Sequence, residues 1–437
     1  MNDNLISIEQ RTISKVRCRI FPLLIIGYLF AFLDRMVVSF AALQMNEDLS
    51  LSATAFGLGA SFFFLGYIIF EIPSNMVMEK VGAKKWMARI LITWGIITAC
   101  MMFVKSGTQL IVLRFLLGAA EAGFYPGMIL YTTYWFPEKQ RGVAISQMLI
   151  GAYVACIIGA PLAGVILQLH DFVGIRGWQW LFLLEGVPSV IIGIIFLALL
   201  VDKPEKAKWL EKEEKEWLVQ TIAVENARKG EDAVKGTLSK ALSSPTVLVS
   251  TLSYTFFLLG FYGLSYFLPQ IIKALTVNSS TIVVTSLTAL PYLGILFSIL
   301  FIAPRSDKTG ERKGYLITAS LIAALGLAAT TFAPNAAFAL LFLTIFGIGS
   351  GIFQPVFWAS STELLKPSEA VIGIAFINSI ASLGSFAGPY LIGVIKDATG
   401  TFHYGTLLLG ISYIIAGIII YSLYVKISRD RKNFLKQ

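Results

Sequence analysis

Four charged residues interrupt two long apolar stretches of the sequence, and their types suit the binding of protons and anions. Arg114 and Glu121 lie in the apolar run 109–131, and Asp34 and Arg35 lie in the first apolar run. A charge at the centre of a bilayer costs roughly 2.5–3.5 kcal/mol even on lenient insertion scales, so charges kept there indicate a function. Their seven-residue spacing places Arg114 and Glu121 on nearly the same helix face, about 10 Å apart along the axis. The four residues therefore predict a proton and anion site between helices.

The composition is that of a polytopic membrane protein. Of the 437 residues, 56% are hydrophobic and only 14% are charged, and the mean hydropathy is +0.74. A soluble protein carries about 25% charged residues. The net charge of +9 belongs to basic loops and does not call for a nucleic-acid partner. The three cysteines form no disulfide framework or metal-ligand spacing, and His170 and His403 are expected at outer helix ends without a ligand role.

About twenty apolar residues are needed for a helix to cross a bilayer, and the sequence contains twelve such runs. They are 20–42, 56–78, 86–104, 109–131, 142–168, 178–201, 246–272, 280–303, 314–332, 336–360, 370–395 and 403–425. These runs are too long for barrel strands, so an all-α membrane protein with twelve transmembrane helices is predicted. Most basic residues lie in the N-terminus, in the loops after runs two, four, eight and ten, and in the C-terminal tail, which places both termini in the cytoplasm. No cleavable signal peptide precedes the first run.

The two halves of the chain are related by an internal repeat. Residues 79–85 (EKVGAKK) and 307–313 (DKTGERK) share a pattern at an offset of 228 residues, and two further landmarks repeat that offset. These landmarks are the pairs Pro161 and Pro389, and Gly123 and Gly351. The repeat predicts two six-helix bundles with the binding site between them near the midplane.

The repeat also predicts the domain organisation. We expect a cytoplasmic segment 1–19, an N-terminal bundle 20–201, a cytoplasmic linker 202–244, a C-terminal bundle 245–426 and a cytoplasmic tail 427–437. The linker mixes charges of both signs with Trp209, Leu210, Trp217 and Leu218, which predicts an amphipathic helix along the membrane surface.

The loop 79–85 and its weaker copy resemble the signature of the major facilitator superfamily, although Asn75 and Ala303 stand where that signature usually has Gly. A narrower resemblance, to the organic anion:cation symporters, rests on four motifs in the right order. They are 32–35 (FLDR), 114–123 (RFLLGAAEAG), 178–186 (WQWLFLLEG) and 378–384 (NSIASLG). This group includes bacterial permeases for sugar acids, tartrate and aromatic acids. The resemblance implies that Asp34 and Glu121 carry coupling protons and that Arg35 meets the substrate carboxylate. Family members often have Tyr at Phe32, so one hydroxyl contact is absent here.

Elementary electrostatics gives these roles a mechanism. A proton and a guanidinium compete for a buried carboxylate, because each neutralises the charge that burial disfavours. We expect proton binding to Glu121 and Asp34 to free Arg35, whose fork then binds a substrate carboxylate through two hydrogen bonds. Proton and substrate then bind with positive coupling. Arg114 is expected either to join the site or to be a charge partner that keeps a neighbouring carboxylate ionised.

The C-terminal half carries no charge at the aligned positions Tyr262, Gly263, Phe342 and Gly349, so it is expected to supply neutral hydrogen bonds and stacking. The candidates for substrate binding are Tyr262, Tyr266, Gln270, Trp358, Ser361, Asn378 and Ser382. For the aromatic members, bundle packing explains their presence equally well. A cytoplasmic gate is expected from Glu79, Lys80, Asp307 and Arg312. Glu71, Glu185 and Glu363 are expected to pair with basic residues at the cytoplasmic helix ends.

The leading hypothesis is a proton-coupled symporter for a small organic anion in the cell (inner) membrane. A sugar acid, a tartrate-like diacid and a hydroxy-aromatic acid all remain open, as does Na⁺ in place of H⁺. The alternative is a facilitator or exporter of a neutral sugar or drug, which would not need Arg35. The sequence contains no metal-ligand cluster or nucleophile–base pair, which argues against a membrane enzyme. A receptor function would leave the central charges without a role. No cofactor is expected, and a monomer is the default state of the family.

Overall fold

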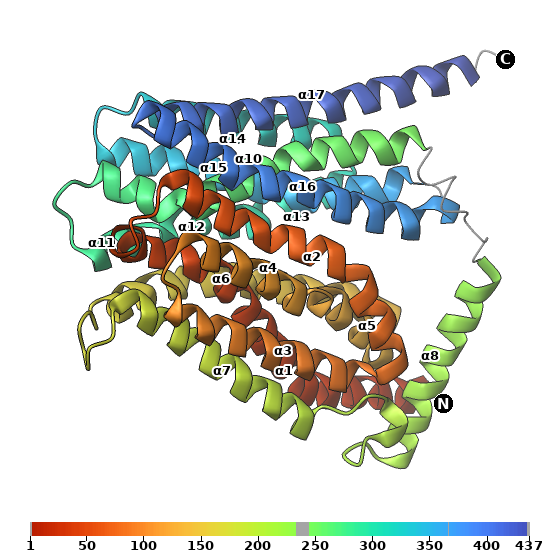
Figure 1. Ribbon diagram of the computed structural model, residues 1–437. Helices are drawn as coiled ribbons and strands as arrows, with labels where there is room; N and C mark the ends of the chain where they lie inside the picture. Colours follow the sequence, from red (N-terminus) through yellow and green to blue (C-terminus); the bar gives the residue numbers. More distant parts are fainter. Residues whose placement is uncertain (1, 233–243, 366, 435–437) are drawn as a thin grey trace.

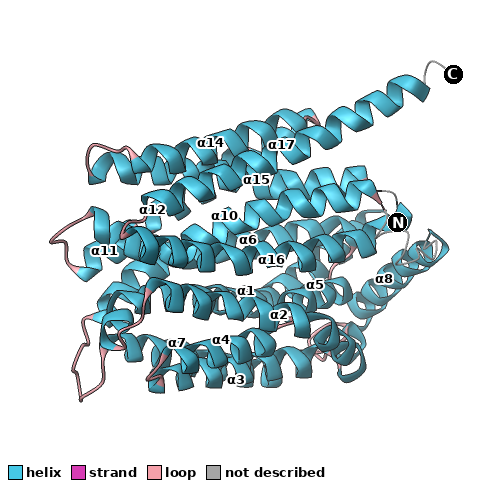
Figure 2. Cartoon of the chain, turned by 45° about the horizontal axis from the view of Figure 1, so that its top comes forward, coloured by secondary structure: helices cyan, strands magenta, loops and turns pink. Residues whose placement is uncertain are grey.

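The computed structural model describes residues 2–232, 244–365 and 367–434, and these are almost entirely helical (Figures 1 and 2). In chain order the elements are α1 (Asn2–Asp48), α2 (Ala53–Val81), α3 (Ala83–Cys100), η1 (Met101–Phe103), α4 (Gly107–Glu121), α5 (Phe124–Trp135), α6 (Glu138–Leu167), α7 (Gly177–Leu199), η2 (Pro204–Lys206), α8 (Lys212–Asp232), α10 (Pro245–Leu275), α11 (Thr281–Leu287), α12 (Ala289–Phe301), α13 (Ala303–Thr309), α14 (Lys313–Thr331), α15 (Ala336–Leu364), α16 (Pro367–Thr399) and α17 (His403–Phe434). No strand occurs within the described ranges, and the predicted all-α class is confirmed.

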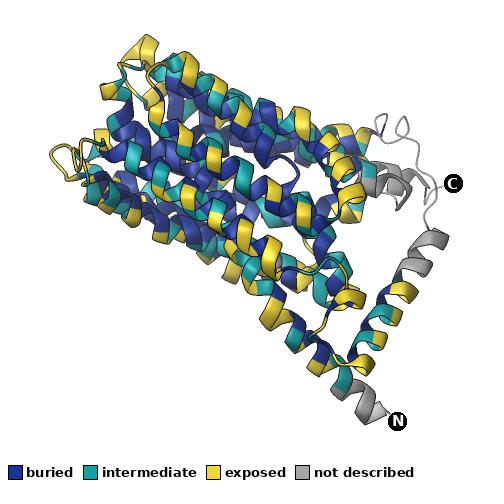
Figure 3. Ribbon diagram, turned by 60° about the horizontal axis from the view of Figure 1, so that its bottom comes forward, coloured by how far each residue is buried: buried dark blue, intermediate teal, exposed yellow. Residues whose placement is uncertain are grey.

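Twelve helical stretches of the described chain are long and apolar enough to cross a membrane, which confirms the twelve predicted spans. Most are longer than the apolar runs, and α1 continues the first span back to Asn2 through the polar N-terminal residues. Large apolar side chains such as Ile72, Leu325 and Ile418 are exposed. Figure 3 shows exposed residues along the outer faces of the helices and buried ones between them. Such a surface suits lipid, whose tails are as apolar as Leu side chains.

The fourth predicted span is two helices with a break between them. α4 ends at Glu121 and α5 begins at Phe124, because Gly123 adopts the left-handed conformation with φ of +89°. Ser74 Oγ of α2 donates a 2.6 Å hydrogen bond to the carbonyl oxygen of Ala122 and so satisfies an acceptor that the break leaves free. The break makes Glu121 the last residue of α4.

The backbones of α2 and α4 touch at a glycine. A Cβ atom at Gly118 would lie 1.9 Å from the carbonyl oxygen of Phe63, so only Gly fits this crossing. Small residues at helix crossings are the usual means of close packing in membranes. The crossing holds the face of α4 that carries Arg114 and Glu121 against α2.

The variant Gly118→Ala is expected to lower the melting temperature of the purified protein. Its Cβ meets backbone that cannot turn aside, and overpacking of this kind costs about 1–3 kcal/mol or more. The matched control is Gly142→Ala in α6, where a Cβ meets nothing within 4 Å. Thermal unfolding of both variants in detergent measures the difference. Equal melting temperatures would contradict the close α2–α4 crossing.

The N-terminal end of α1, the C-terminal end of α17 and the helix α8 all lie at one end of the bundle, here called the terminal side (Figure 1). At the other end, the opposite side, hydrogen bonds join the two halves. Asp397 of α16 accepts from the backbone N–H groups of Ala53, at 3.0 Å, and Thr54, at 2.7 Å. Lys273 of α10 donates to the carbonyl oxygen of Leu43 at 3.2 Å. These contacts close the two halves together on the opposite side.

Two exposed cysteines mark the two sides of the bundle. Cys18 lies in the part of α1 that reaches the terminal side, and Cys100 ends α3 on the opposite side. The third cysteine, Cys156, is buried in α6.

A helix, α8, lies within the expected linker, and part of the linker's apolar side chains pack on the protein. Leu218 and Leu210 are buried, and Trp209 stacks on Trp135 of α5 at 5.4 Å between ring centroids. The buried carboxylate of Glu214 pairs with Arg11 and Lys15 of α1 at 2.8 and 2.9 Å. These ion pairs bring the linker onto the first helix.

The charge state of Glu214 follows from this surrounding. Burial by itself would raise the pKa of the Glu214 carboxyl, but hydrogen bonds from Lys15 and from the Glu211 backbone, with the charges of Lys15 and Arg11, lower it below its usual range. The contact therefore stabilises the docked helix above the ordinary pKa of a glutamate and weakens as the pH falls through the lowered value.

Candidate functional site

Arg35 and Glu121, both predicted site residues, form an ion pair between α1 and α4. Arg35 Nε and Nη2 donate to the same carboxylate oxygen, Glu121 Oε1, at 2.7 and 2.6 Å. The Glu121 side chain is 1% exposed and that of Arg35 is 18% exposed. The second oxygen, Glu121 Oε2, is buried and has no hydrogen-bond partner within the described residues. The pair thus leaves one carboxylate oxygen available to a proton.

Aromatic rings of α2 hold the Arg35 guanidinium. Its Cζ atom lies 5.1 Å from the ring centroid of Tyr67 and 5.4 Å from that of Phe63. A guanidinium over a ring face gains about 0.5–2 kcal/mol, more where water is absent. No sequence pattern indicates this role for Tyr67, because one tyrosine in the phenylalanine-rich stretch 62–67 is typical of helix packing.

Arg114 is fully buried and contacts the other half of the molecule. Its Nη2 atom donates to the hydroxyl of Tyr266 of α10 at 2.9 Å, and its Cζ lies 4.7 Å from the Phe63 ring centroid. Within the described residues Arg114 has no carboxylate at ion-pair distance, and its Nε and Nη1 atoms have no hydrogen-bond partner. The direct carboxylate contact expected of a charge partner is therefore not present in this structure. Its charge acts on Glu121 and Asp34 only through space.

The variant Tyr266→Phe is expected to raise the half-saturating concentration of the transported solute by about tenfold. It removes the one acceptor of the buried Arg114 charge, and a hydrogen bond to a charged group is worth about 1.5–3 kcal/mol, while 1.4 kcal/mol is tenfold. The control is Tyr413→Phe, which removes a buried hydroxyl bonded to Ser350 inside the second half. Solute-dependent uptake rates compare the two variants. An unchanged half-saturating concentration in Tyr266→Phe would remove Tyr266 from the site.

Asp34 is held by a different helix from the one that holds Arg35. Adjacent residues on a helix point about 100° apart, so Asp34 faces α3 while Arg35 faces α2 and α4. The Asp34 side chain is fully buried, and Thr98 of α3 donates to its Oδ1 atom. Its Oδ2 atom has no partner within the described part of the chain. The two predicted proton carriers are thus held by different elements, and Thr98 is a partner that the sequence did not reveal.

The seven neutral candidates of the second half lie at different depths. Tyr262 and Tyr266 lie at the charged cluster of Arg35, Arg114 and Glu121. Tyr266 accepts the hydrogen bond from Arg114, the Tyr262 ring centroid lies 6.2 Å from that of Tyr266, and Tyr262 is within electrostatic range of Arg35. Gln270, one turn beyond Tyr266 toward the opposite side, accepts a 3.3 Å hydrogen bond from Asn46 of α1. The two tyrosines are therefore close to Arg35 and Arg114. Gln270 joins the two halves nearer to the opposite side.

The remaining candidates lie on α15 and α16. Trp358 donates to the hydroxyl of Tyr254 at 3.2 Å, and Ser361 is buried without a hydrogen-bond partner in the described structure. Asn378 donates to Glu71 of α2 at 3.4 Å, and Ser382 donates to the carbonyl oxygen of Asn378 at 2.9 Å. Of these, only Asn378 forms a hydrogen bond to the first half within the described structure.

The four predicted gate residues all lie on the terminal side, and no ion pair or hydrogen bond within the described residues joins them across the two halves. Glu79 and Lys80 are exposed. Arg312 pairs with Asp307 at 2.6 Å and with Glu363 at 2.7 Å, all within the second half. The hydrogen bonds that Arg312 donates to Glu363 and Asp307 raise the pKa of Arg312 above its usual range. The expected pairing of Glu363 with a basic residue is present.

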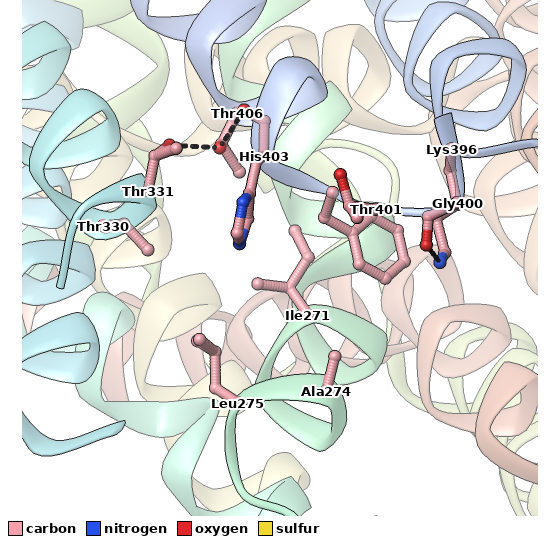
Figure 4. A pocket seen from close by; sticks show the side chains of 11 residues that line it. Ile271, Ala274, Leu275, Thr330, Thr331, Lys396, Gly400, Thr401, His403 and Thr406 are labelled. Atoms are coloured by element: carbon pink, nitrogen blue, oxygen red, sulfur yellow. Dashed lines mark hydrogen bonds between the residues drawn. The ribbon is translucent and has the colours of Figure 1, made fainter. Parts of the chain in front are cut away.

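One surface pocket lies elsewhere, at the opposite side of the second half (Figure 4). It is lined by Ile271, Ala274, Leu275, Thr330, Thr331, Lys396, Gly400, Thr401, Phe402, His403 and Thr406. Lys396 is already bound there to the carbonyl oxygen of Gly400 and lies 5.0 Å from the Phe402 ring centroid. The pocket contains none of the predicted site residues.

The sequence model of the Major Facilitator Superfamily matches residues 24–280 and 251–437, nearly the whole chain. A protein of Agrobacterium vitis, provisionally named a tartrate transporter, is 42% identical over 431 residues that cover 99% of this chain and 96% of that protein. A protein of Acinetobacter baumannii named a quinolone resistance transporter is 36% identical over 97% of each chain.

Solved structures agree in fold. The crystal structure of a D-xylose-proton symporter superposes with a TM-score of 0.74 at 16% identity and covers 92% of this chain and 97% of its own. With twelve membrane-spanning helices, a buried ion pair between α1 and α4, and relatives that are transporters and not enzymes, this multi-pass membrane protein belongs to the major facilitator superfamily, in its anion:cation symporter-like group.

Proposed function

We propose that this transporter carries a small organic anion together with protons by alternating access. The observation that supports it best is the Arg35–Glu121 pair, in which two guanidinium nitrogens share one carboxylate oxygen. An anion can replace that oxygen only if the charge of Glu121 is removed, because an unpaired buried charge is costly. A proton on Glu121 does this and leaves both Arg35 nitrogens to a substrate carboxylate.

The surroundings of the pair fit an anion with a polar body. Arg114 brings a second buried positive charge, and its hydrogen bond to Tyr266 joins the charged cluster to the second half. We propose that Tyr262, Tyr266, Trp358, Asn378 and Ser382 offer hydrogen bonds or stacking to the neutral part of the solute. Gln270 and Ser361 belong to the same set of candidates but lie farther from the ion pair along their helices. Asp34, held by Thr98 away from Arg35, is the second proton carrier in this proposal.

Alternating access requires two bodies, and the proposed ones are residues 20–201 and 245–426. The hydrogen bonds of Asp397 and Lys273 hold these two bodies together on the opposite side. The basic loops argue that the terminal side is cytoplasmic, so the structure corresponds to a carrier closed toward the outside of the inner membrane. In the reverse state Glu79, Lys80, Asp307 and Arg312 would come together as a gate.

The Acinetobacter baumannii relative supports a second candidate, export of a drug. An exporter of neutral or cationic drugs has no use for a guanidinium that must be freed by protonation. A site that binds a carboxylate through Arg35 therefore separates the two functions.

Counterflow in liposomes tests the proposal. Purified protein is reconstituted in vesicles loaded with unlabelled solute, and uptake of labelled tartrate, gluconate, 4-hydroxybenzoate, xylose and ethidium, a cation without a carboxylate, is measured with and without an inward proton gradient. We expect counterflow of at least one carboxylate and its accumulation when the outside is acidic. Counterflow of xylose or ethidium alone would overturn the proposal.

A further inference from the structure

A third buried carboxylate lies close to the site and has no place in the mechanism above. Glu71 of α2 is 5% exposed and, within the described residues, has no cation at ion-pair distance. Each of its oxygens instead accepts from a neutral side chain of α16: Oε1 from Asn378 Nδ2 at 3.4 Å, and Oε2 from Ser379 Oγ at 3.1 Å. The sequence predicted a basic partner at a cytoplasmic helix end, and this expectation is wrong. The three residues Glu71, Asn378 and Ser379 are called the α2–α16 carboxylate contact below.

The depth of this contact follows from the helix that carries it. Tyr67, whose ring lies 5.1 Å from the Arg35 guanidinium, precedes Glu71 by four residues, which is about 6 Å along the axis. Because α2 runs from the opposite side to the terminal side, Glu71 lies one turn beyond Arg35 toward the terminal side. The contact therefore lies between the ion pair and the terminal side.

The other hydrogen bonds between these two helices lie on the far side of the site. Ser61 donates to the carbonyl oxygen of Phe386 at 2.5 Å, and Asp397 accepts from Ala53 and Thr54 at the start of α2. Of the α2–α16 hydrogen bonds of the described residues, those of Glu71 are nearest to the terminal side. If α16 moves away from α2 at this depth, the Glu71 charge loses both donors and is left buried, which is costly.

The contact is also placed to respond to the solute. Arg35 lies within electrostatic range of Glu71, so the state of the ion pair affects this carboxylate. Asn378 has one amide, and at 3.4 Å its bond to Glu71 is longer than the usual range. An acceptor on a bound solute can compete for that amide, while Ser379 keeps its own bond to Glu71.

We propose that Glu71 is a positioning residue of the transport cycle, which holds α16 against α2 on the terminal side of the site and gives up the Asn378 amide to the bound anion. The contact thereby opposes opening to the terminal side until the solute has bound. The anion-dependent part of this inference rests on the proposed function, whereas the holding of α16 does not.

The first test is a distance measurement that needs no solute. Spin labels are attached at Val77 of α2 and Ala375 of α16, both exposed, after the exposed Cys18 and Cys100 are replaced with Ser. Glu71→Ala should shift the distance distribution toward longer values, and Glu71→Gln, whose amide oxygen still accepts, should largely restore it. The control Ser61→Ala breaks a hydrogen bond between the same helices on the other side of the site. An unchanged distribution in Glu71→Ala, or an equal shift in Ser61→Ala, would overturn the proposal.

The second test uses transport in the same variants. We expect Glu71→Ala, which removes both hydrogen bonds of the carboxylate, to slow exchange of the anion by about tenfold or more, while its affinity for the anion is unchanged or higher. Reduced affinity with unchanged turnover would overturn the anion-dependent part. If the unaltered protein exchanges no carboxylate, the proposed function fails, and the distance measurement still decides the holding role of Glu71.

Discussion

The variant Glu121→Gln is expected to lose uphill accumulation of the anion while it keeps exchange of the anion across the membrane. A gradient of two pH units supports about a hundredfold accumulation for each coupled proton, because one unit is worth about 1.36 kcal/mol. Gln resembles the protonated side chain, so Arg35 stays free to bind the anion, but no proton is carried at this position. With Arg35 free at any pH, anion binding no longer depends on a proton at Asp34 either, so accumulation should fall from about a hundredfold or more to equal concentrations on the two sides.

The measurement is uptake into liposomes under an inward proton gradient, followed by counterflow at equal pH with the same preparation. The control Glu213→Gln changes an exposed glutamate of α8, outside the membrane spans, and should behave like the unaltered protein. If Glu121→Gln still accumulates the anion against its gradient, Glu121 is not the coupling residue and the mechanism is wrong.

The variant Arg35→Lys is expected to lose both accumulation and exchange. Lys cannot reproduce the two donors that Arg35 presents to Glu121 Oε1 and would present to the solute carboxylate. Truncating one partner of a buried hydrogen-bonded charge pair costs about 2–5 kcal/mol, so anion affinity should fall by at least about 30-fold. Binding to the purified protein, measured by calorimetry, and counterflow both report this loss.

The matched control is Arg89→Lys in α3, where the guanidinium is exposed and lies over the Trp86 ring at 4.3 Å. This variant should keep full activity. Together the two predictions separate the roles, because the Glu121 change removes only coupling and the Arg35 change removes binding. A carrier that exchanges the anion normally with Lys at position 35 would refute the proposed site.

The helices of this fold could be predicted because each depends on its own composition. A run of about twenty apolar residues has no stable alternative to a helix in lipid, whatever it packs against. The break after Glu121 could not be predicted in the same way, since a single Gly such as Gly123 is tolerated inside a helix. Its left-handed conformation is fixed by Ser74 of another helix, which a local pattern does not contain.

The site residues likewise divide into those that the sequence identifies and those that only the packing of helices reveals. Asp34, Arg35, Arg114 and Glu121 stand out from the sequence because charges are rare in membrane spans. Their partners do not stand out: Thr98 and Tyr67 are side chains of common type, and only the packing of α2 and α3 against α1 brings them to the charges. For the same reason the sequence identified Glu71 as a charged residue but assigned it the wrong partners.

The two exposed cysteines give the protein a built-in report of its topology. Cys18 and Cys100 lie at different ends of the bundle, and the buried Cys156 should not react with thiol reagents. If the terminal side is cytoplasmic, as proposed, a thiol reagent that does not cross lipid should modify Cys100 in intact cells and spare Cys18 until the cells are broken open. The chain thus reports which way round it was inserted, without any added tag.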